Sequence, residues 1–306
     1  MKGYFRGVPM ENRNWSEKIQ SIYSLDTSRD LRFTENKIEE IIEFIRIKNA
    51  KNILEVGCGT GTFTRKIRKY LSKDIKITGL DMDHNFINYC RKKAKKEKLS
   101  NIQYIEGDAL SLPFDNNTFD ACTSHTVIEH VPNKKFLEEQ YRVCKEGGYV
   151  SILNIRPELA LMSKDNITPT TREKVLMNKI DLYTKEVKDE LKVGKYFDNP
   201  QNILRLFEKV GFKEIHLDTL NYVSCTDDAR NSYKRKRLII ESEHESILQF
   251  INMSIGAKES ILTVKEKDEL MGLINERYVK RINMLDENKR LWDFNISPMI
   301  IISGQK

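Results

Sequence analysis

The chain has 306 residues, of which 39% are apolar and 32% charged, and its formal net charge is +7. This size and composition predict a soluble globular protein with one large α/β core, or a core with added lobes. No apolar run approaches the ~18 residues of a membrane helix, and the first residues lack the apolar centre of a signal peptide. We therefore expect a cytoplasmic protein without a membrane span. The five cysteines form no C-x-x-C pair, which argues against a disulfide framework and a structural zinc site.

Two basic runs contribute to the positive charge, RKKAKKEK at 91–98 and YKRKR at 233–237. Such runs can bind nucleic acid. However, 45 acidic residues are spread through the chain, and lysine-rich helix faces are commonly just solvated surface. We therefore do not expect nucleic acid as the main partner, and the second run keeps RNA open only as an alternative.

Strands and helices alternate through the first half of the chain. Apolar runs predict strands at 52–56, 75–81, 101–109, 118–125 and 149–155. Apolar residues at helical spacing predict helices at 34–48, 62–71, 84–98 and 133–145. We expect Gly147 and Gly148 to cap the last of these helices. Alternation at this interval predicts an α/β fold with a doubly wound, mostly parallel sheet.

The pattern changes after residue 156. A helix is predicted at 200–212 and strands at 212–223 and 294–306, which makes a seven-stranded sheet. The two last strands are separated by about seventy residues with helical periodicity, far more than a hairpin loop needs. The predicted organisation is an N-terminal cap at 1–33, a core at 34–156, a helical insertion at 157–199, more core at 200–224, a helical lid at 225–291 and the last core strand at 292–306.

Three glycines at alternate positions, Gly57, Gly59 and Gly61, follow the first strand in LEVGCGTG (54–61). A strand that leads through a glycine-rich turn into a helix creates a site for an anion or a cofactor, because backbone N–H groups point outward and no Cβ blocks close approach. The spacing G-x-G-x-G differs from the dinucleotide fingerprint G-x-G-x-x-G, and no G-K-[ST] follows. The loop therefore predicts a cofactor other than NAD and no P-loop.

Four stretches in this order resemble the class I S-adenosylmethionine-dependent methyltransferases, within the ubiquinone-biosynthesis-like and type 11 group. They are LEVGCGTG (54–61), GLDMD (79–83), EGDALSLPFDNNTFD (106–120) and SHTVIEHVPN (124–133). The resemblance covers roughly residues 35–155 and the terminal strand. It implies a Rossmann-like methyltransferase fold with helical caps, and S-adenosylmethionine as cofactor with S-adenosylhomocysteine as product.

The resemblance also implies a set of cofactor-binding residues. Glu55 would hold the loop or the ammonium group of the cofactor, Asp81 the ribose hydroxyls and Asp108 the adenine amino group. Met82 would lie on the adenine, and Cys58 would fill space in the loop. The complete predicted set is Glu55, Gly57, Cys58, Gly59, Gly61, Asp81, Met82, Asp108, Ala109, Ser124 and His125.

The caps suggest a small or medium-sized acceptor with an oxygen, nitrogen or sulfur nucleophile, enclosed in a pocket. Trp15, Tyr23 and Arg32 in the N-terminal cap are expected to bind it. His125 or His130 could act as a catalytic base, because imidazole titrates near neutral pH. No metal is expected. An RNA methyltransferase that uses the basic insertion, and a non-catalytic cofactor-binding regulator, remain alternatives.

Overall fold

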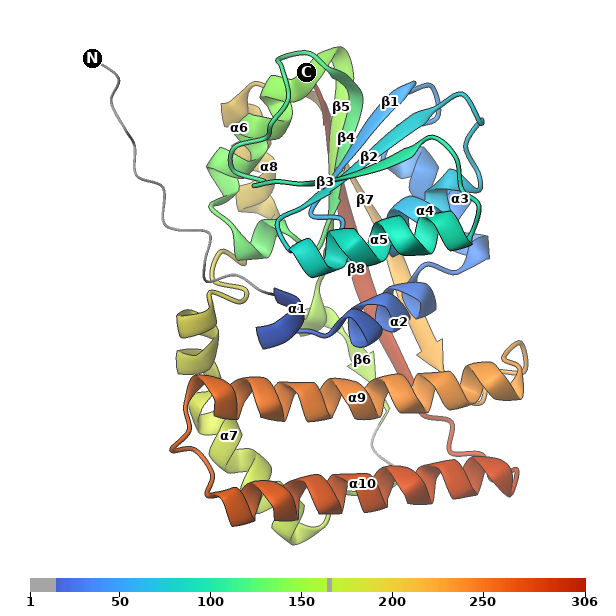
Figure 1. Ribbon diagram of the computed structural model, residues 1–306, viewed down its shortest axis with the longest axis vertical. Helices are drawn as coiled ribbons and strands as arrows, with labels where there is room; N and C mark the ends of the chain where they lie inside the picture. The colour runs from blue at the N-terminus through green and yellow to red at the C-terminus, as the bar shows by residue number, and fades with distance from the viewer. Residues whose placement is uncertain (1–14, 164–166) are drawn as a thin grey trace.

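A sheet of eight strands runs through the computed structural model, which describes residues 15–163 and 167–306 (Figure 1). The strands are β1 (Asn52–Val56), β2 (Lys76–Asp81), β3 (Ile102–Glu106), β4 (Phe119–His125), β5 (Cys144–Ile155), β6 (Leu161–Met162), β7 (Lys213–Cys225) and β8 (Phe294–Gln305). Their order is β3-β2-β1-β4-β5-β8-β6, and β7 pairs with β8 along nearly its whole length. Only the pairs that include β8 are antiparallel, so the predicted doubly wound, mostly parallel α/β sheet is confirmed.

The eighth strand is the two-residue β6, which the sequence did not predict. It pairs with β8 at Ile296 and Asn295, beyond the residues of β8 that pair with β5. Both residues of β6 are exposed, and this short segment carries no apolar alternation. The signal that identifies the other strands is therefore missing here.

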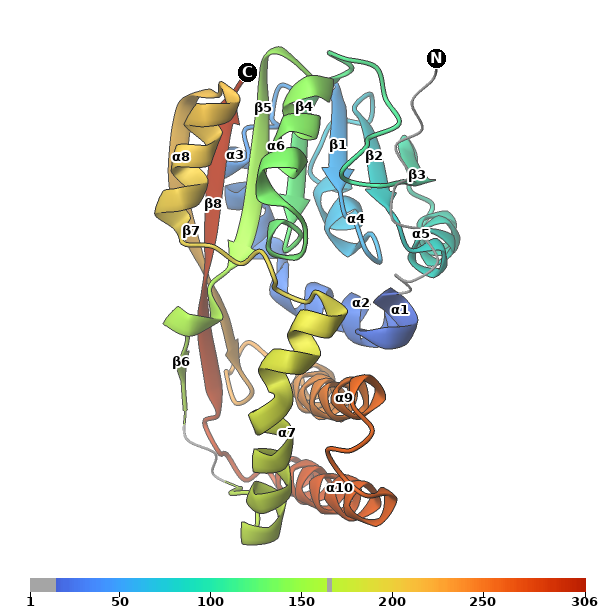
Figure 2. The ribbon, with the colours of Figure 1, turned by 90° about the vertical axis from the view of Figure 1, so that its left-hand side faces the viewer.

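Helices cover both faces of the sheet (Figure 2). They are α1 (Trp15–Lys18), α2 (Ile22–Arg32), α3 (Glu35–Phe44), α4 (Thr62–Arg68), α5 (His84–Lys96), α6 (Asn133–Val143), α7 (Thr171–Leu191), α8 (Pro200–Val210), α9 (Tyr233–Ala257) and α10 (Val264–Asp286). The side chains of adjacent residues in β1 lie on opposite faces of the sheet and belong to two different apolar cores. Ile53 packs with α3 and α4, whereas Leu54 packs with α6 and α8. A parallel strand that is buried on both faces reads as a continuous apolar run, which explains why NILEV was recognisable.

The prediction that Gly147 and Gly148 cap a helix is wrong. α6 ends at Val143, and the next residue already begins β5. The two glycines lie where the register between β4 and β5 shifts, and Gly147 adopts a positive φ of 76°. A Cβ on Gly148 would come within 2.6 Å of the carbonyl oxygen of Asp120, so the close approach of β4 requires glycine.

The helices α7, α9 and α10 form a helical lobe with its own apolar core (Figures 1 and 2). α9 and α10 occupy the connection between β7 and β8, whose ends Cys225 and Phe294 are register partners. α2 lies between the carboxyl ends of the parallel strands and α9 in both views. No helix among the described residues is long and apolar enough to span a membrane.

Candidate functional site

The loop between β1 and α4 has the conformation that only glycine adopts freely. Gly57, Gly59 and Gly61 have positive φ values of 73°, 53° and 69°. A Cβ on Gly61 would lie 2.7 Å from the Tyr104 hydroxyl and 2.8 Å from the sulfur of Cys90. The loop therefore packs tightly on its inner side and leaves its outer side for a ligand or a covering element.

Two carboxylates lie at the ends of the next two strands, and the first of them contacts the loop. Asp81 ends β2, and its carboxylate accepts hydrogen bonds from the backbone N–H groups of Gly59 (2.8 Å) and Asp83 (2.9 Å). Burial raises the pKa of Asp81 to about 6. Asp108 follows β3, and its Oδ1 accepts from the N–H of Leu110 at 2.8 Å. Met82 and Ala109, the neighbours predicted to contact adenine, are both half-buried beside these carboxylates.

Glu55 lies behind the loop and is almost completely buried. Its carboxyl group accepts a hydrogen bond from the Thr64 hydroxyl on α4. Burial is the main reason that the pKa of Glu55 rises to about 8. Cys58 is buried as well, and burial raises the pKa of its thiol well above the ordinary value, which makes it a space-filling group and a poor nucleophile.

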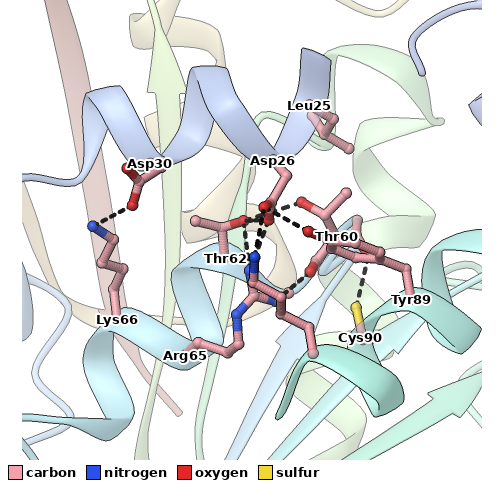
Figure 3. Close-up of polar contacts among 12 residues, drawn as sticks. Leu25, Asp26, Asp30, Thr60, Thr62, Arg65, Lys66, Tyr89 and Cys90 are labelled. Atoms are coloured by element: carbon pink, nitrogen blue, oxygen red, sulfur yellow. Dashed lines mark hydrogen bonds and ion pairs between the residues drawn. The ribbon is translucent and has the colours of Figure 1, made fainter. Parts of the chain in front are cut away.

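α2 crosses the outer side of the glycine loop and is attached there by Asp26 (Figure 3). The Asp26 carboxylate accepts hydrogen bonds from the Thr62 hydroxyl (2.5 Å), the Arg65 guanidinium (2.7 Å) and the Tyr89 hydroxyl (2.7 Å). Leu25, one residue earlier, lies over Gly59. This attachment was not predicted from the sequence. The sequence does contain one indication that this helix packs on the core: Leu25, Arg29 and Arg32 recur at helical spacing and so share one face of α2.

The three residues predicted to bind the acceptor occupy different environments. Arg32 donates toward Nε2 of His125 at 3.2 Å, and Trp15 packs edge-on against His130 with ring centroids 4.7 Å apart. Tyr23 is 52% exposed. The structure therefore brings Arg32 and Trp15 to the two predicted catalytic histidines, and leaves Tyr23 on the surface.

Both histidines are neutral and already hydrogen-bonded. His125 ends β4 and packs against the rings of Phe33 and Phe63, and burial beside two arginines holds its pKa well below the ordinary value. Nδ1 of His130 accepts a hydrogen bond from the N–H of Gly194 at 2.9 Å, and burial lowers its pKa to about 4. A catalytic base needs a free acceptor nitrogen. Here the acceptor nitrogen of each imidazole already receives a hydrogen bond, from Arg32 at His125 and from Gly194 at His130. Ser124, the residue before His125, is buried inside β4.

A small hollow, partly open to solvent, lies on the α8 side of β5 and β8. Its polar lining includes Glu129, Asn154, Arg156 and Asp198, and Asn154 donates a hydrogen bond to the Glu129 carboxylate at 2.8 Å. Burial raises the pKa of Glu129 to about 7. In the described ranges, no group of three or more histidine, cysteine or acidic side chains is placed to hold a metal ion.

Residues 54–152 match the family of methyltransferase domains. This range contains the glycine loop, Asp81, Asp108 and both histidines. Together with the sheet order and the antiparallel β8, the match identifies residues 54–152 as a methyltransferase domain.

Two curated relatives and one solved structure illustrate the likeness. A demethylmenaquinone methyltransferase of Listeria welshimeri is 32% identical over 117 residues, which are 38% of this chain and 50% of the relative. The chain thus spans about half the length of that relative. A demethylmenaquinone methyltransferase of Staphylococcus carnosus is 26% identical over 218 residues, 68% of this chain and 90% of the relative. Phosphoethanolamine N-methyltransferase 2 of Haemonchus contortus, solved with S-adenosylmethionine, has a TM-score of 0.56 at 18% identity, over 98% of this chain and 60% of that one. This last likeness shows the fold alone.

Proposed function

We propose that the protein transfers the methyl group of S-adenosylmethionine to a small or medium-sized acceptor. The observation that carries the proposal is the juxtaposition of the left-handed glycine loop with the carboxylates of Asp81 and Asp108 at the carboxyl edge of one sheet. Open α/β sheets bind ligands at this edge. In the complex, Asp81 would accept from the ribose hydroxyls, Asp108 from the adenine amino group, and Glu55 would pair with the ammonium group.

The bound cofactor would supply an electrophilic methyl group on a sulfonium. The chain's part is to orient the acceptor nucleophile, to exclude water and, for an acidic acceptor proton, to remove that proton. α2 and the helical lobe support the exclusion of water, because they lie over the strand ends. Positioning rather than strong base catalysis fits the neutral, hydrogen-bonded His125 and His130.

Calorimetry with S-adenosylmethionine and S-adenosylhomocysteine tests cofactor binding. We expect both to bind the wild-type protein, and Asp81→Asn to weaken binding by about 1.5–3 kcal/mol, the range for hydrogen bonds to a charged group. Glu138→Gln is the matched control, because Glu138 is an acidic residue exposed on α6. A folded protein without detectable binding at millimolar cofactor contradicts the proposal.

Formation of S-adenosylhomocysteine in the presence of candidate acceptors tests methyl transfer. The names of the Listeria and Staphylococcus relatives make demethylmenaquinone-like quinols the first acceptors to assay. RNA is assayed in parallel. Three residues of the basic run at 233–237 contact the protein itself, because Arg235 donates to the Leu31 carbonyl and Lys236 and Arg237 pair with Asp227 and Glu241. These contacts support a structural role for the run. Binding without turnover on any acceptor would favour the regulator alternative.

A further inference from the structure

Two arginines on α2, Arg29 and Arg32, point toward the end of β4. Nη2 of Arg29 donates to the Thr126 hydroxyl at 2.8 Å, and Nη1 of Arg32 donates toward Nε2 of His125 at 3.2 Å. Both of these partners are neutral groups. The third arginine near the glycine loop, Arg65, differs because it has a carboxylate partner, Asp26, at 2.7 Å.

The charge of this pair is only weakly compensated. Within the described part of the chain, the buried Nε of Arg32 has no hydrogen-bond acceptor. Glu129 attracts both guanidinium groups electrostatically, and Glu55 attracts that of Arg29. Burial raises the pKa of both acids, to about 7 for Glu129 and about 8 for Glu55, so neither is a full counter-charge near neutral pH. Two cations in a partly desolvated site favour an added anion.

We propose that Arg29 and Arg32 together bind an oxyanion of a ligand at the end of β4. A guanidinium presents its N–H groups in a planar fork that matches carboxylate and phosphate oxygens. This inference rests on the proposed function, since the pair lies beside the glycine loop. Val127, the residue after the Thr126 that Arg29 contacts, packs against Gly57. The oxyanion has two possible sources, the carboxylate of the cofactor's methionine part and an acidic group on the acceptor.

Two ligands, one with and one without the methionine carboxylate, test whether the pair binds the cofactor. S-Adenosylhomocysteine carries the amino-acid part, and 5′-methylthioadenosine lacks it. If the pair holds the cofactor carboxylate, Arg29→Gln and Arg32→Gln weaken S-adenosylhomocysteine binding by at least ~10-fold and leave 5′-methylthioadenosine binding unchanged. Arg46→Gln is the matched control. Its Nε is also buried without an acceptor in the described chain, but its guanidinium lies over the Tyr149 ring.

Inorganic phosphate tests whether the pair binds an acidic group of the acceptor. If the pair holds an acceptor oxyanion, phosphate binds wild-type protein that is saturated with S-adenosylhomocysteine, and the Gln variants lose this binding while they keep the affinity for both nucleosides. Arg→Lys at each position retains the charge and serves where a Gln variant does not fold. The inference is overturned if the Gln variants bind both nucleosides equally more weakly, or if their affinity for all three ligands is unchanged. Wild-type protein that binds neither nucleoside rejects the proposed function as well.

Discussion

Glu55 is an acid that its surroundings keep largely protonated. Its pKa of about 8 in the folded chain, against 4.5 as the ordinary value, means that the folded state loses stability as the pH rises through this window. An ammonium group placed beside the carboxyl group favours the ionised form. We therefore expect cofactor binding near pH 7 to release a proton from Glu55, and the affinity to rise between about pH 6 and 8.

The proton release is measured by calorimetry in phosphate and Tris buffers, whose ionisation enthalpies differ. Near pH 7 the ligand's own amino group is already mostly charged. Glu55→Gln should remove the buffer dependence, and 5′-methylthioadenosine, which has no ammonium group, should not show it. A binding enthalpy that is the same in both buffers for the wild-type protein refutes the assignment of the ammonium group to Glu55.

The glycines of the loop are expected to differ in their tolerance of a methyl group. At Gly61 a Cβ meets the buried Tyr104 and Cys90 side chains, whereas at Gly59 it meets only the end of Leu25 at 2.9 Å. Gly61→Ala should lower the free energy of unfolding by about 2–4 kcal/mol, since a left-handed conformation and overpacking combine. Gly59→Ala should cost about 1–2 kcal/mol, mainly for the conformation. Urea unfolding measures both, and equal losses contradict this interpretation.

At the scale of elements, Asp26 is expected to hold α2 on the glycine loop. Burial acts to raise the pKa of Asp26, but hydrogen bonds from Thr62, Tyr89 and Arg65 outweigh burial and lower it. The stabilisation is therefore present above the ordinary pKa and is lost as the pH falls through the lowered one. Asp26→Asn should reduce the free energy of unfolding by about 2–4 kcal/mol at neutral pH, and by less in acid.

Asp30 provides a control on the same helix. Its carboxylate pairs with Lys66 at 2.6 Å but is 45% exposed, so Asp30→Asn should cost less than about 1 kcal/mol. Urea unfolding at neutral and acid pH compares the two variants, and limited proteolysis reports whether α2 detaches. Comparable losses for both variants would falsify the special role of Asp26.

The parts of the fold that the sequence predicted are those with a local signal. The glycine loop with its flanking strand and helix, and the carboxylates at the strand ends, follow from neighbouring residues. The attachment of α2 through Asp26 does not, because Asp26 meets Arg65 and Tyr89 only through tertiary packing. The hydrogen bond from Gly194 to His130 spans 64 positions and has no sequence pattern. The catalytic prediction for both histidines rested on residue type and position alone, and the environment that sets their charge comes from other elements.

At the scale of the whole molecule, the helical lobe depends on segments that are distant in the sequence. Leu176 and Ile180 of α7 share an apolar core with Leu270 and Ile274 of α10. Replacement of residues 226–293 by a short Gly-Ser turn should leave the sheet folded, because the turn would join the register partners that end β7 and β8. α7 should then lose its helical structure, since its buried face is exposed.

Circular dichroism and calorimetry test this excision. The loss of helix should exceed what α9 and α10 contribute, cofactor binding should remain within about tenfold, and methyl transfer should disappear. Cofactor binding is expected to weaken slightly, because Gln249 and Arg235 of α9 contact Ser21, which caps the start of α2, and Leu31 near its end. An unfolded sheet in the shortened chain shows instead that the lobe is part of the core scaffold.

The position of α9 and α10 between two paired strand ends also has an evolutionary consequence. A recombination event that exchanges the codons for 226–293 leaves every strand register and every residue proposed to bind the cofactor intact, because Cys225 and Phe294 remain neighbours. The exchanged lobe must still fit α7, which a separate stretch of the gene encodes. Lineages that diverge in acceptor are therefore expected to show correlated changes in these two stretches, while the glycine loop and the strand ends change slowly.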